Sequence, residues 1–230
     1  MPNPYFQFKQ FTVRHDKCAM KVGTDGVLLG AWAPVQDAKR ILDVGAGSGL
    51  ISLQLAQRNP EAAITSVEID PAAAAQAQEN IQSSPWNHRM EVVCCDFRKY
   101  HPEDRFDLIV SNPPYFVDAL KCPDNQRCMA RHTSELSYEL LFGHSAHFLS
   151  ERGSISIIIP AEVDTAWKYN FHPHRRLYVF TKPGKPCRRV LLTFGYQDVP
   201  CIEDSLYIEG EKHGQFTPEY IALTKDFYLR

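Results

Sequence analysis

The chain has 230 residues, of which 44% are hydrophobic and 23% charged, a size and composition that suit one folded domain of moderate size. The formal net charge of −2 excludes a uniformly basic nucleic-acid coat, and no apolar run reaches the ~20 residues of a membrane span. The N-terminus has no signal-peptide-like apolar segment, and none of the seven cysteines forms a C-x-x-C pair. Reduced thiols in a cytoplasmic protein explain this cysteine pattern, so we expect a cytoplasmic location without membrane contact.

Residues 1–39 are expected to form a segment of their own on the substrate side of the molecule. The spacing of Phe6, Phe8, Phe11 and Val13 predicts extended structure, such as a hairpin. Residues 24–32 then predict a short helix with Thr24 or Asp25 near its cap. We expect this segment to pack as a lid over one edge of the following domain.

Residues 40–230 predict a single α/β domain with a C-terminal helical tail. Strands are predicted at 40–44, 63–68, 90–94, 106–111, 154–159, 176–181, 190–196 and, more briefly, 206–209; helices are predicted at 50–58, 72–82, 138–149 and 218–228. Strands that alternate with helices indicate a mostly parallel sheet covered on both faces. In such sheets, ligands bind outside the carboxyl ends of the strands.

The predicted helices carry recognisable start signals. Pro71 opens the helix that ends at 82, and Asp70 before it is expected to be a loop or cap residue. Ser137 is the expected N-cap of the helix over 138–149. Thr217 and Pro218 occupy the N-cap and first positions of the last helix.

A glycine turn containing Gly45, Gly47 and Gly49 follows the strand at 40–44. These glycines let the backbone approach a ligand closely. The turn does not match a dinucleotide fingerprint, because the third glycine would fall at Leu50, and it lacks the lysine of a phosphate-binding loop. Asp43, two positions before the first glycine, either orients the turn or holds a cationic amine, which favours a cofactor that carries an amino acid.

Two carboxylates follow the next two strands. Glu68 lies 19 residues beyond Gly49, where it can accept both hydroxyls of a ribose. Asp96 can accept from an adenine amino group, and the neighbouring Phe97 can flank the ring. All of these residues are expected at one sheet edge, so the sequence predicts a nucleoside-type cofactor there.

Asn112-Pro113-Pro114-Tyr115, directly after the strand at 106–111, indicates a pocket for a planar amine. The Asn112 side-chain oxygen can accept one N–H bond, and the carbonyl of Pro113, held extended by the following proline, can accept the second. Tyr115 can stack on the ring that carries the amine. Such a pocket leaves the nitrogen lone pair available as a nucleophile.

Clusters of basic residues predict an anionic macromolecular substrate. They are Arg14/His15/Lys17/Lys21, Arg127/Arg131/His132, His172/His174/Arg175/Arg176 and Lys182/Lys185/Arg188/Arg189. Arg131 and His132 are expected to line the substrate entrance. Arg175 and Arg176 are expected to contact RNA phosphates, which predicts a weaker salt dependence of binding when both are removed.

The segment from Arg40 to Tyr196 resembles the S-adenosylmethionine-dependent methyltransferases of the Rossmann-like, class I type. The resemblance lies in Asp43–Gly49, Glu68, Asp96 and Asn112–Tyr115. It implies a seven-stranded sheet of order 3-2-1-4-5-7-6 with an antiparallel seventh strand, S-adenosylmethionine as cofactor, and an amine methylated at the Asn112 loop.

A closer resemblance, over nearly the whole chain, is to the bacterial tRNA1(Val) (adenine(37)-N6)-methyltransferase family. The residues that carry it are Phe8-Lys9-Gln10-Phe11-Thr12-Val13 and the stretch from Met20 to Trp32, which includes Lys-Val-Gly-Thr-Asp-Gly-Val. It implies that the substrate is an adenine beside the anticodon in tRNA, with Lys21 and Thr24 on the substrate side.

Other functions compatible with the same motifs are kept as alternatives. An N5-glutamine protein methyltransferase also binds a planar NH₂ group, but such enzymes usually carry a larger N-terminal helical domain. Methylation of a guanine N2 amine in RNA is a second alternative, and a non-catalytic RNA-binding module is a third, of another class. The sequence indicates no metal site and no cysteine nucleophile, and a monomer is the expected oligomeric state.

Overall fold

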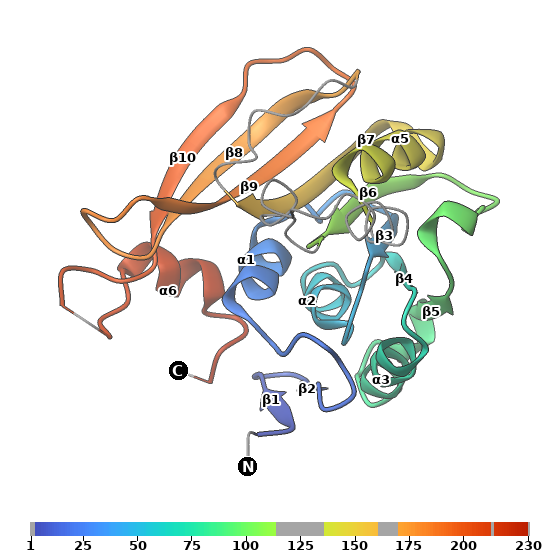
Figure 1. Ribbon diagram of the computed structural model, residues 1–230, viewed down its shortest axis with the longest axis horizontal. Coiled ribbons are helices and arrows are strands. Elements are labelled where there is room, and N and C mark those ends of the chain that lie inside the picture. Colours follow the sequence, from blue (N-terminus) through green and yellow to red (C-terminus); the bar gives the residue numbers. More distant parts are fainter. Residues whose placement is uncertain (1–2, 114–135, 161–169, 213, 230) are drawn as a thin grey trace, which may run out of the picture.

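The computed structural model describes residues 3–113, 136–160, 170–212 and 214–229. They form an eight-stranded sheet with helices on both faces (Figure 1), and a separate two-stranded hairpin. The strands are β1 (Tyr5–Gln7), β2 (Thr12–Arg14), β3 (Arg40–Val44), β4 (Ala63–Glu68), β5 (Met90–Cys94), β6 (Phe106–Ser111), β7 (Leu149–Pro160), β8 (His172–Phe180), β9 (Cys187–Gly195) and β10 (Ile202–Tyr207). The α-helices are α1 (Thr24–Trp32), α2 (Leu50–Arg58), α3 (Pro71–Gln82), α5 (Tyr138–Phe148) and α6 (Pro218–Thr224). None of these described helices is both long enough and apolar enough to cross a bilayer.

The large sheet has the strand order β10-β8-β9-β7-β6-β3-β4-β5. Without β10, this order corresponds to the predicted 3-2-1-4-5-7-6, and β9 runs antiparallel to both β7 and β8 as expected. The predicted count of seven strands was wrong for the part of the chain described, because β10 adds an eighth strand parallel to β8. The class I methyltransferase architecture is therefore confirmed, with one additional edge strand.

The extra strand lies earlier in the chain than the short strand predicted at 206–209. Of the residues in Ile202–Tyr207, Leu206 is buried and the others are exposed. An edge strand that buries one side chain leaves almost no periodic signal in the sequence, which is why its position was misjudged.

Several other predicted boundaries shift by a few residues. β7 begins directly at the end of α5, five residues before the predicted start, and β8 begins at His172 rather than at 176. The last helix ends at Thr224 instead of 228, and a turn in which Phe227 N–H donates to the Thr224 carbonyl replaces its final part. The predicted caps at Asp70, Ser137 and Thr217 are confirmed by their side-chain bonds to backbone N–H groups.

Alternating apolar side chains divide the core between the two faces of the sheet. On β6, Leu108 and Val110 face α1, α2 and α6, whereas Phe106 and Ile109 face α5. Figure 1 shows α1 and α2 on one side of the sheet and α5 on the other. Because both faces are covered, the carboxyl edge of the central strands is left to hold a ligand.

Helix α1 approaches α2 unusually closely, and two glycines explain why. A Cβ at Gly26 would lie 3.0 Å from Leu50 Cδ2, and one at Gly30 would lie 2.3 Å from Gln54 Oε1. Gln54 is buried and donates through Nε2 to the Val27 carbonyl at 3.2 Å. This packing places the first turn of α1 next to the glycine turn that precedes α2.

The N-terminal hairpin packs against the end of the chain. β1 and β2 pair antiparallel as predicted, and Phe8 stacks with Phe11 and with Tyr228. The Lys9 N–H donates to the Phe227 carbonyl at 2.8 Å. The hairpin therefore shares a core with the rest of the molecule, and its function as a lid stays a prediction.

Candidate cofactor and amine site

The central strands end together at one edge of the sheet. Val44 of β3 is paired with Val67 of β4 on one side and with Ser111 of β6 on the other. The chain proceeds from β3 outward through β4 and β5, then returns to the other side of β3 as β6, so the order reverses between β3 and β6. Such a reversal point is where open α/β sheets bind ligands.

The glycine turn leaves space for a ligand beside its backbone. Gly45, Gly47 and Gly49 have φ values of 73°, 56° and 78°, a left-handed conformation that side chains rarely adopt. A Cβ at Gly45 or Gly47 would have no atom within 4 Å, whereas one at Gly49 would lie 3.4 Å from Ala77 Cβ. The first two glycines thus border open space, and the third packs against α3.

Asp43 is fully buried beneath the turn. Its Oδ2 accepts from the Ser52 backbone N–H at 3.1 Å and from the Ser52 hydroxyl at 2.6 Å. Burial raises the pKa of Asp43 to about 6, an effect that the bonds from Ser52 partly oppose. Asp43 therefore ties the glycine turn to α2, while its Oδ1 has no partner among the described residues. Because Asp43 is fully buried, its second predicted role, toward a cationic amine, stays a prediction.

Glu68 is held in place by two backbone N–H groups. Its Oε2 accepts from Gly47 at 2.8 Å and its Oε1 accepts from Asp70 at 2.9 Å, and only 8% of the residue is exposed. Each carboxylate oxygen can accept a further bond. Glu68 consequently links the end of β4 to the glycine turn in a fixed orientation.

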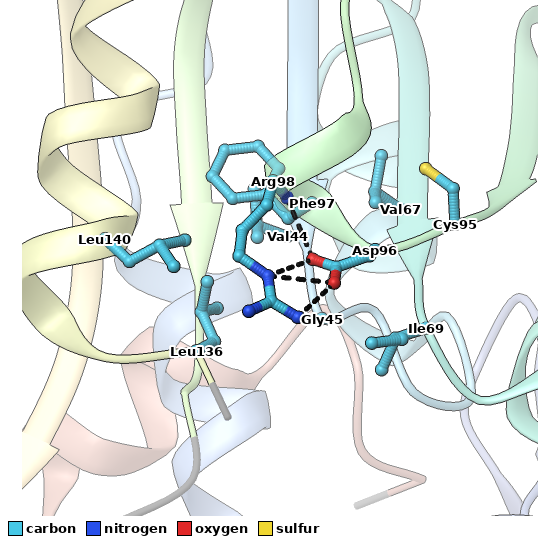
Figure 2. A pocket seen from close by; sticks show the side chains of 10 residues that line it. All are labelled: Val44, Gly45, Val67, Ile69, Cys95, Asp96, Phe97, Arg98, Leu136 and Leu140. Carbon is cyan, nitrogen blue, oxygen red and sulfur yellow. Dashed lines mark hydrogen bonds and ion pairs between the residues drawn. The ribbon is translucent and has the colours of Figure 1, made fainter. Parts of the chain in front are cut away.

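A cavity of about 70 Å³ lies at this sheet edge (Figure 2). It is lined by Val44, Gly45, Val67, Ile69, Cys95, Asp96, Phe97, Arg98, Leu136 and Leu140. Apolar side chains on two sides and a carboxylate at the rim suit a planar heterocycle with an amino group. The structure thus brings the predicted Asp96 and Phe97 together with Gly45.

Some residues of this cavity were not found from the sequence. Ile69, Leu136 and Leu140 reach it from the end of β4 and from the start of α5. The signal for Ile69 is visible only in the structure, where 54% of this large apolar residue is exposed at the sheet edge. Leu136 and Leu140 lie far along the chain, so only the fold shows that they face Asp96.

Arg98 crosses the cavity and binds Asp96 (Figure 2). Its Nε donates to both carboxylate oxygens, at 2.9 and 2.8 Å, and its Nη2 forms a further ion pair with Oδ2. The Arg98 backbone N–H also donates to Oδ1 at 3.0 Å. Hydrogen bonding from Arg98 lowers the pKa of Asp96, so the carboxylate stays ionised as an acceptor.

A second cavity of about 360 Å³ adjoins the first across Gly45. It is lined by Met20, Lys21, Gly23, Thr24, Asp25, Gly26, Gly45, Ala46, Gly47, Ser48, Leu50, Ile51, Asn112 and Pro113. The predicted residues Lys21, Thr24, Gly47 and Asn112 therefore meet around one space. The two cavities therefore have Gly45 as a common wall, with Asp96 at one and Asn112 at the other.

Two polar contacts fix the walls of the second cavity. The Ser111 hydroxyl donates to the Val44 carbonyl at 2.8 Å, which locks the end of β6 to the end of β3 just before Asn112. Asp25 of α1 accepts from Arg189 Nε of β9 at 2.8 Å, which ties the first turn of α1 to the sheet. Both Asp25 and Arg189 were missed as site supports, because they are 164 residues apart.

The remaining predicted site residues lie elsewhere. Tyr115, Arg131 and His132 fall outside the described residues. Arg175, on β8, places its guanidinium 4.6 Å from the centre of the Trp32 ring, and burial lowers its pKa. Arg176 pairs with Glu203 of β10 at 3.0 Å. Neither arginine lines the two cavities, and RNA contact by these two residues stays a prediction.

Comparison with known proteins agrees with this architecture. The family model described as "Methyltransferase small domain" matches residues 20–168. A protein of Bacteroides thetaiotaomicron named tRNA1(Val) (adenine(37)-N6)-methyltransferase is 54% identical over 100% of this chain and 99% of its own length. A protein of the same name from Salmonella typhi is 44% identical over 97% of this chain and 94% of its own.

The fold also resembles solved structures of low sequence identity. A predicted O-methyltransferase from Agrobacterium tumefaciens superposes with a TM-score of 0.66, at 20% identity over 88% of this chain and 96% of that chain. TrmN from Thermus thermophilus gives a TM-score of 0.56 at 20% identity, covering 79% of this chain and 52% of that chain. At these identities the likeness supports the fold only.

Proposed function

Because the chain belongs to the bacterial tRNA1(Val) (adenine(37)-N6)-methyltransferase family, we propose that it transfers a methyl group from S-adenosylmethionine to the N6 amine of an adenine in tRNA. The substrate position that this membership suggests is adenine 37 of the anticodon loop of tRNA1(Val). The observation that carries the proposal is the pair of cavities that meet at Gly45, one bordered by Asp96 and the other by Asn112.

The residues of the first cavity and of the glycine turn fit S-adenosylmethionine. Gly45 and Gly47 border space that a Cβ would fill, as close approach of the amino-acid portion requires. Glu68 is oriented to accept ribose hydroxyls, and Asp96 is oriented to accept an adenine amino group. The unpartnered Oδ1 of Asp43 supplies negative charge for the ammonium group.

The second cavity suits the amine that is methylated. Asn112 Oδ1 and the Pro113 carbonyl each accept one N–H of the planar amino group, since a residue that precedes a proline favours extended geometry. Tyr115, which lies outside the described residues, is predicted to stack on the base. These contacts fix the distance and direction of the N6 nitrogen relative to the methyl group of S-adenosylmethionine. Such positioning is the main requirement of a displacement reaction.

The chemistry then needs little beyond positioning. The bound cofactor supplies an electrophilic methyl group on a sulfonium, which requires no covalent attachment to the protein. As the N6 nitrogen gains positive character, its two hydrogen bonds to Asn112 and Pro113 strengthen, so these residues stabilise the transition state more than the ground state. The released proton passes to water. An adenine in a loop is already unstacked in part, which lowers the cost of inserting it.

The test is methyl transfer to RNA. Purified protein is incubated with radiolabelled S-adenosylmethionine and total tRNA from a strain that lacks this enzyme, and the nucleosides are then separated. We expect the label in N6-methyladenosine. Label in N2-methylguanosine would contradict the adenine assignment and support a guanine-N2 methyltransferase. Label on glutamine in an added protein fraction would contradict it and support a protein methyltransferase. No transfer to either, with tRNA binding retained, would identify a non-catalytic RNA-binding module.

The proposed function also suggests where the protein acts and in which oligomeric state. A tRNA substrate places the protein in the bacterial cytoplasm. We propose that it acts as a monomer. Sedimentation of the protein with and without tRNA tests this, and a sedimentation coefficient of a dimer would contradict it.

A further inference from the structure

The structure distinguishes among the basic residues that the sequence places near the site. Lys17 pairs with Glu79 at 2.6 Å, Arg176 pairs with Glu203, and Arg189 pairs with Asp25. The half-buried Arg175 lies over Trp32. These four residues support contacts within the protein, so they are poorly suited to bind an external anion.

Four other basic residues have no such role. In the described part of the chain, the side chains of Lys21, Lys182, Lys185 and Arg188 contact no acidic group. Lys21, Lys185 and Arg188 are exposed, and Lys182 is half-buried. Unpaired, solvated cations of this kind are what a phosphate backbone can recruit at little cost.

Lys182 and Lys185 lie on the connection between β8 and β9, and Arg188 is the second residue of β9; residues 181–189 together are called the β8–β9 turn below. Residues 181–189 contain four basic residues and no acidic one. The turn is closed by Lys185 N–H donating to the Lys182 carbonyl at 3.2 Å, with Gly184 at a φ of 74°. An acidic residue, Glu209, lies beside the start of the turn, where its backbone N–H donates to the Thr181 carbonyl at 2.9 Å. The positive side of the turn is thus the part that leads into β9.

The turn extends from the sheet edge that holds the site. Pro160, at the end of β7, is paired with Arg189, and Arg189 is paired with Val179 near the end of β8. β8 is three strand spacings from β6, or roughly 14 Å. Arg189 also contacts Asp25, which lines the Asn112 cavity together with Lys21. The wall of the cavity that contains Lys21 and Asp25 is therefore in contact with the turn, through the Asp25–Arg189 ion pair.

We propose that the β8–β9 turn, through Lys182, Lys185 and Arg188, binds the phosphates of the tRNA stem next to the base that enters the Asn112 cavity, with Lys21 at the cavity mouth. This inference rests on the proposed function and adds to it the surface that orients the RNA. The contacts are to phosphates, so they position the substrate without reading its sequence.

The test compares two double variants that each remove two exposed positive charges. Lys185→Ala with Arg188→Ala alters the turn. Lys39→Ala with Arg152→Ala is the matched control, because both residues are exposed and lie at the opposite sheet edge, before β3 and near the start of β7. Binding of unmodified tRNA is measured at several salt concentrations, together with binding of S-adenosylmethionine.

We expect the turn variant to bind tRNA roughly 10- to 30-fold more weakly near 0.15 M salt, and its log–log salt slope to fall by about 1.4 to 1.8. The control variant should bind as the wild type does, and both variants should keep their affinity for S-adenosylmethionine. Exchanging the two charges, Lys185→Arg with Arg188→Lys, should restore binding, because a phosphate contact needs the charge rather than one side-chain shape.

The outcomes separate the two proposals. If the turn variant has the same affinity and salt slope as the control while the wild type methylates tRNA, the turn is not the docking surface and the proposed function stands. If the wild type neither binds nor methylates tRNA, the proposed function fails, and the docking surface fails with it.

Discussion

Asn112 is the residue on which the proposed chemistry depends most directly. Asn112→Ala removes one acceptor of the N6 amine but leaves the residues around Asp96 and Glu68 untouched. We expect nearly unchanged affinity for S-adenosylmethionine and a single-turnover methylation rate lowered roughly 10²- to 10³-fold, by analogy with the loss of one transition-state hydrogen bond elsewhere.

A matched variant separates the acceptor role from a loss of shape. Asn112→Asp keeps an oxygen acceptor at the same position, so it should retain more activity than the alanine variant. Wild-type turnover in Asn112→Ala would show that the amine is held by other groups.

We expect Asp43 to make cofactor binding depend on pH. Burial raises its pKa to about 6, so the carboxyl is ionised above this pH and neutral below it. Only the ionised form attracts the ammonium group of S-adenosylmethionine. Affinity should therefore fall as pH decreases through 6, by up to about tenfold per unit, and binding near pH 6 should release a proton.

Calorimetry in two buffers of different ionisation enthalpy measures that proton. In Asp43→Asn the pH dependence between 5 and 7 should disappear. A wild-type affinity that stays constant over this range would mean that Asp43 only orients the glycine turn.

The predictability of the site from the sequence differs from residue to residue. The glycine turn, Glu68, Asp96 and Asn112 could be found because each lies at or just beyond the carboxyl end of a strand, and the ends of parallel strands lie at one edge. Ile69, Arg98 and Leu140 could not, because their position depends on how separate loops converge. The Asp25–Arg189 pair was invisible for the same reason.

At the scale of elements, the close packing of α1 on α2 explains why the stretch after Gly23 contains glycines at 26 and 30. Gly30→Ala would place a methyl group 2.3 Å from Gln54 Oε1 and 2.9 Å from Gln54 Cβ. Because Gln54 is fully buried, it has little room to move. We expect a loss of about 1–3 kcal/mol in the free energy of unfolding, measured by chemical denaturation.

Gly143 of α5 offers a matched control for this substitution. It also lies within a helix, but a Cβ there would have no atom within 4 Å. Gly143→Ala should raise stability by about 0.5–1 kcal/mol, since alanine favours the helix. Equal stability of Gly30→Ala and the wild type would contradict a tight α1–α2 contact.

The sequence predicted the bounds of strands most accurately where the pattern of apolar residues is strong. β3, β4 and β6 begin and end as predicted, because their apolar residues are buried on both faces. The edge strand β5 also has its predicted bounds, although only Met90 in it is buried. The outer strands β8, β9 and β10 were misplaced at their ends, since edge and half-buried strands carry charged and polar residues that break the pattern. Here strand pairing, rather than local propensity, decides the boundaries.

At the scale of the whole molecule, the order of strands determines where the reaction takes place. β4 and β6 flank β3 on opposite sides, so a ring can lie beside β4 while an amine lies beside β6. The N-terminal helix completes the second cavity from above the glycine turn. The outer strands then extend past this edge and carry the unpaired positive charges of the β8–β9 turn.

The most direct test of the account is single-turnover methylation of an unmodified tRNA1(Val) transcript, compared with the same transcript carrying guanine in place of adenine 37. The account predicts one methyl group per adenine transcript, recovered as N6-methyladenosine, and none on the guanine transcript. Equal transfer to both transcripts would contradict it, because the methyl group would then be placed on another base than the one assigned to the Asn112 cavity.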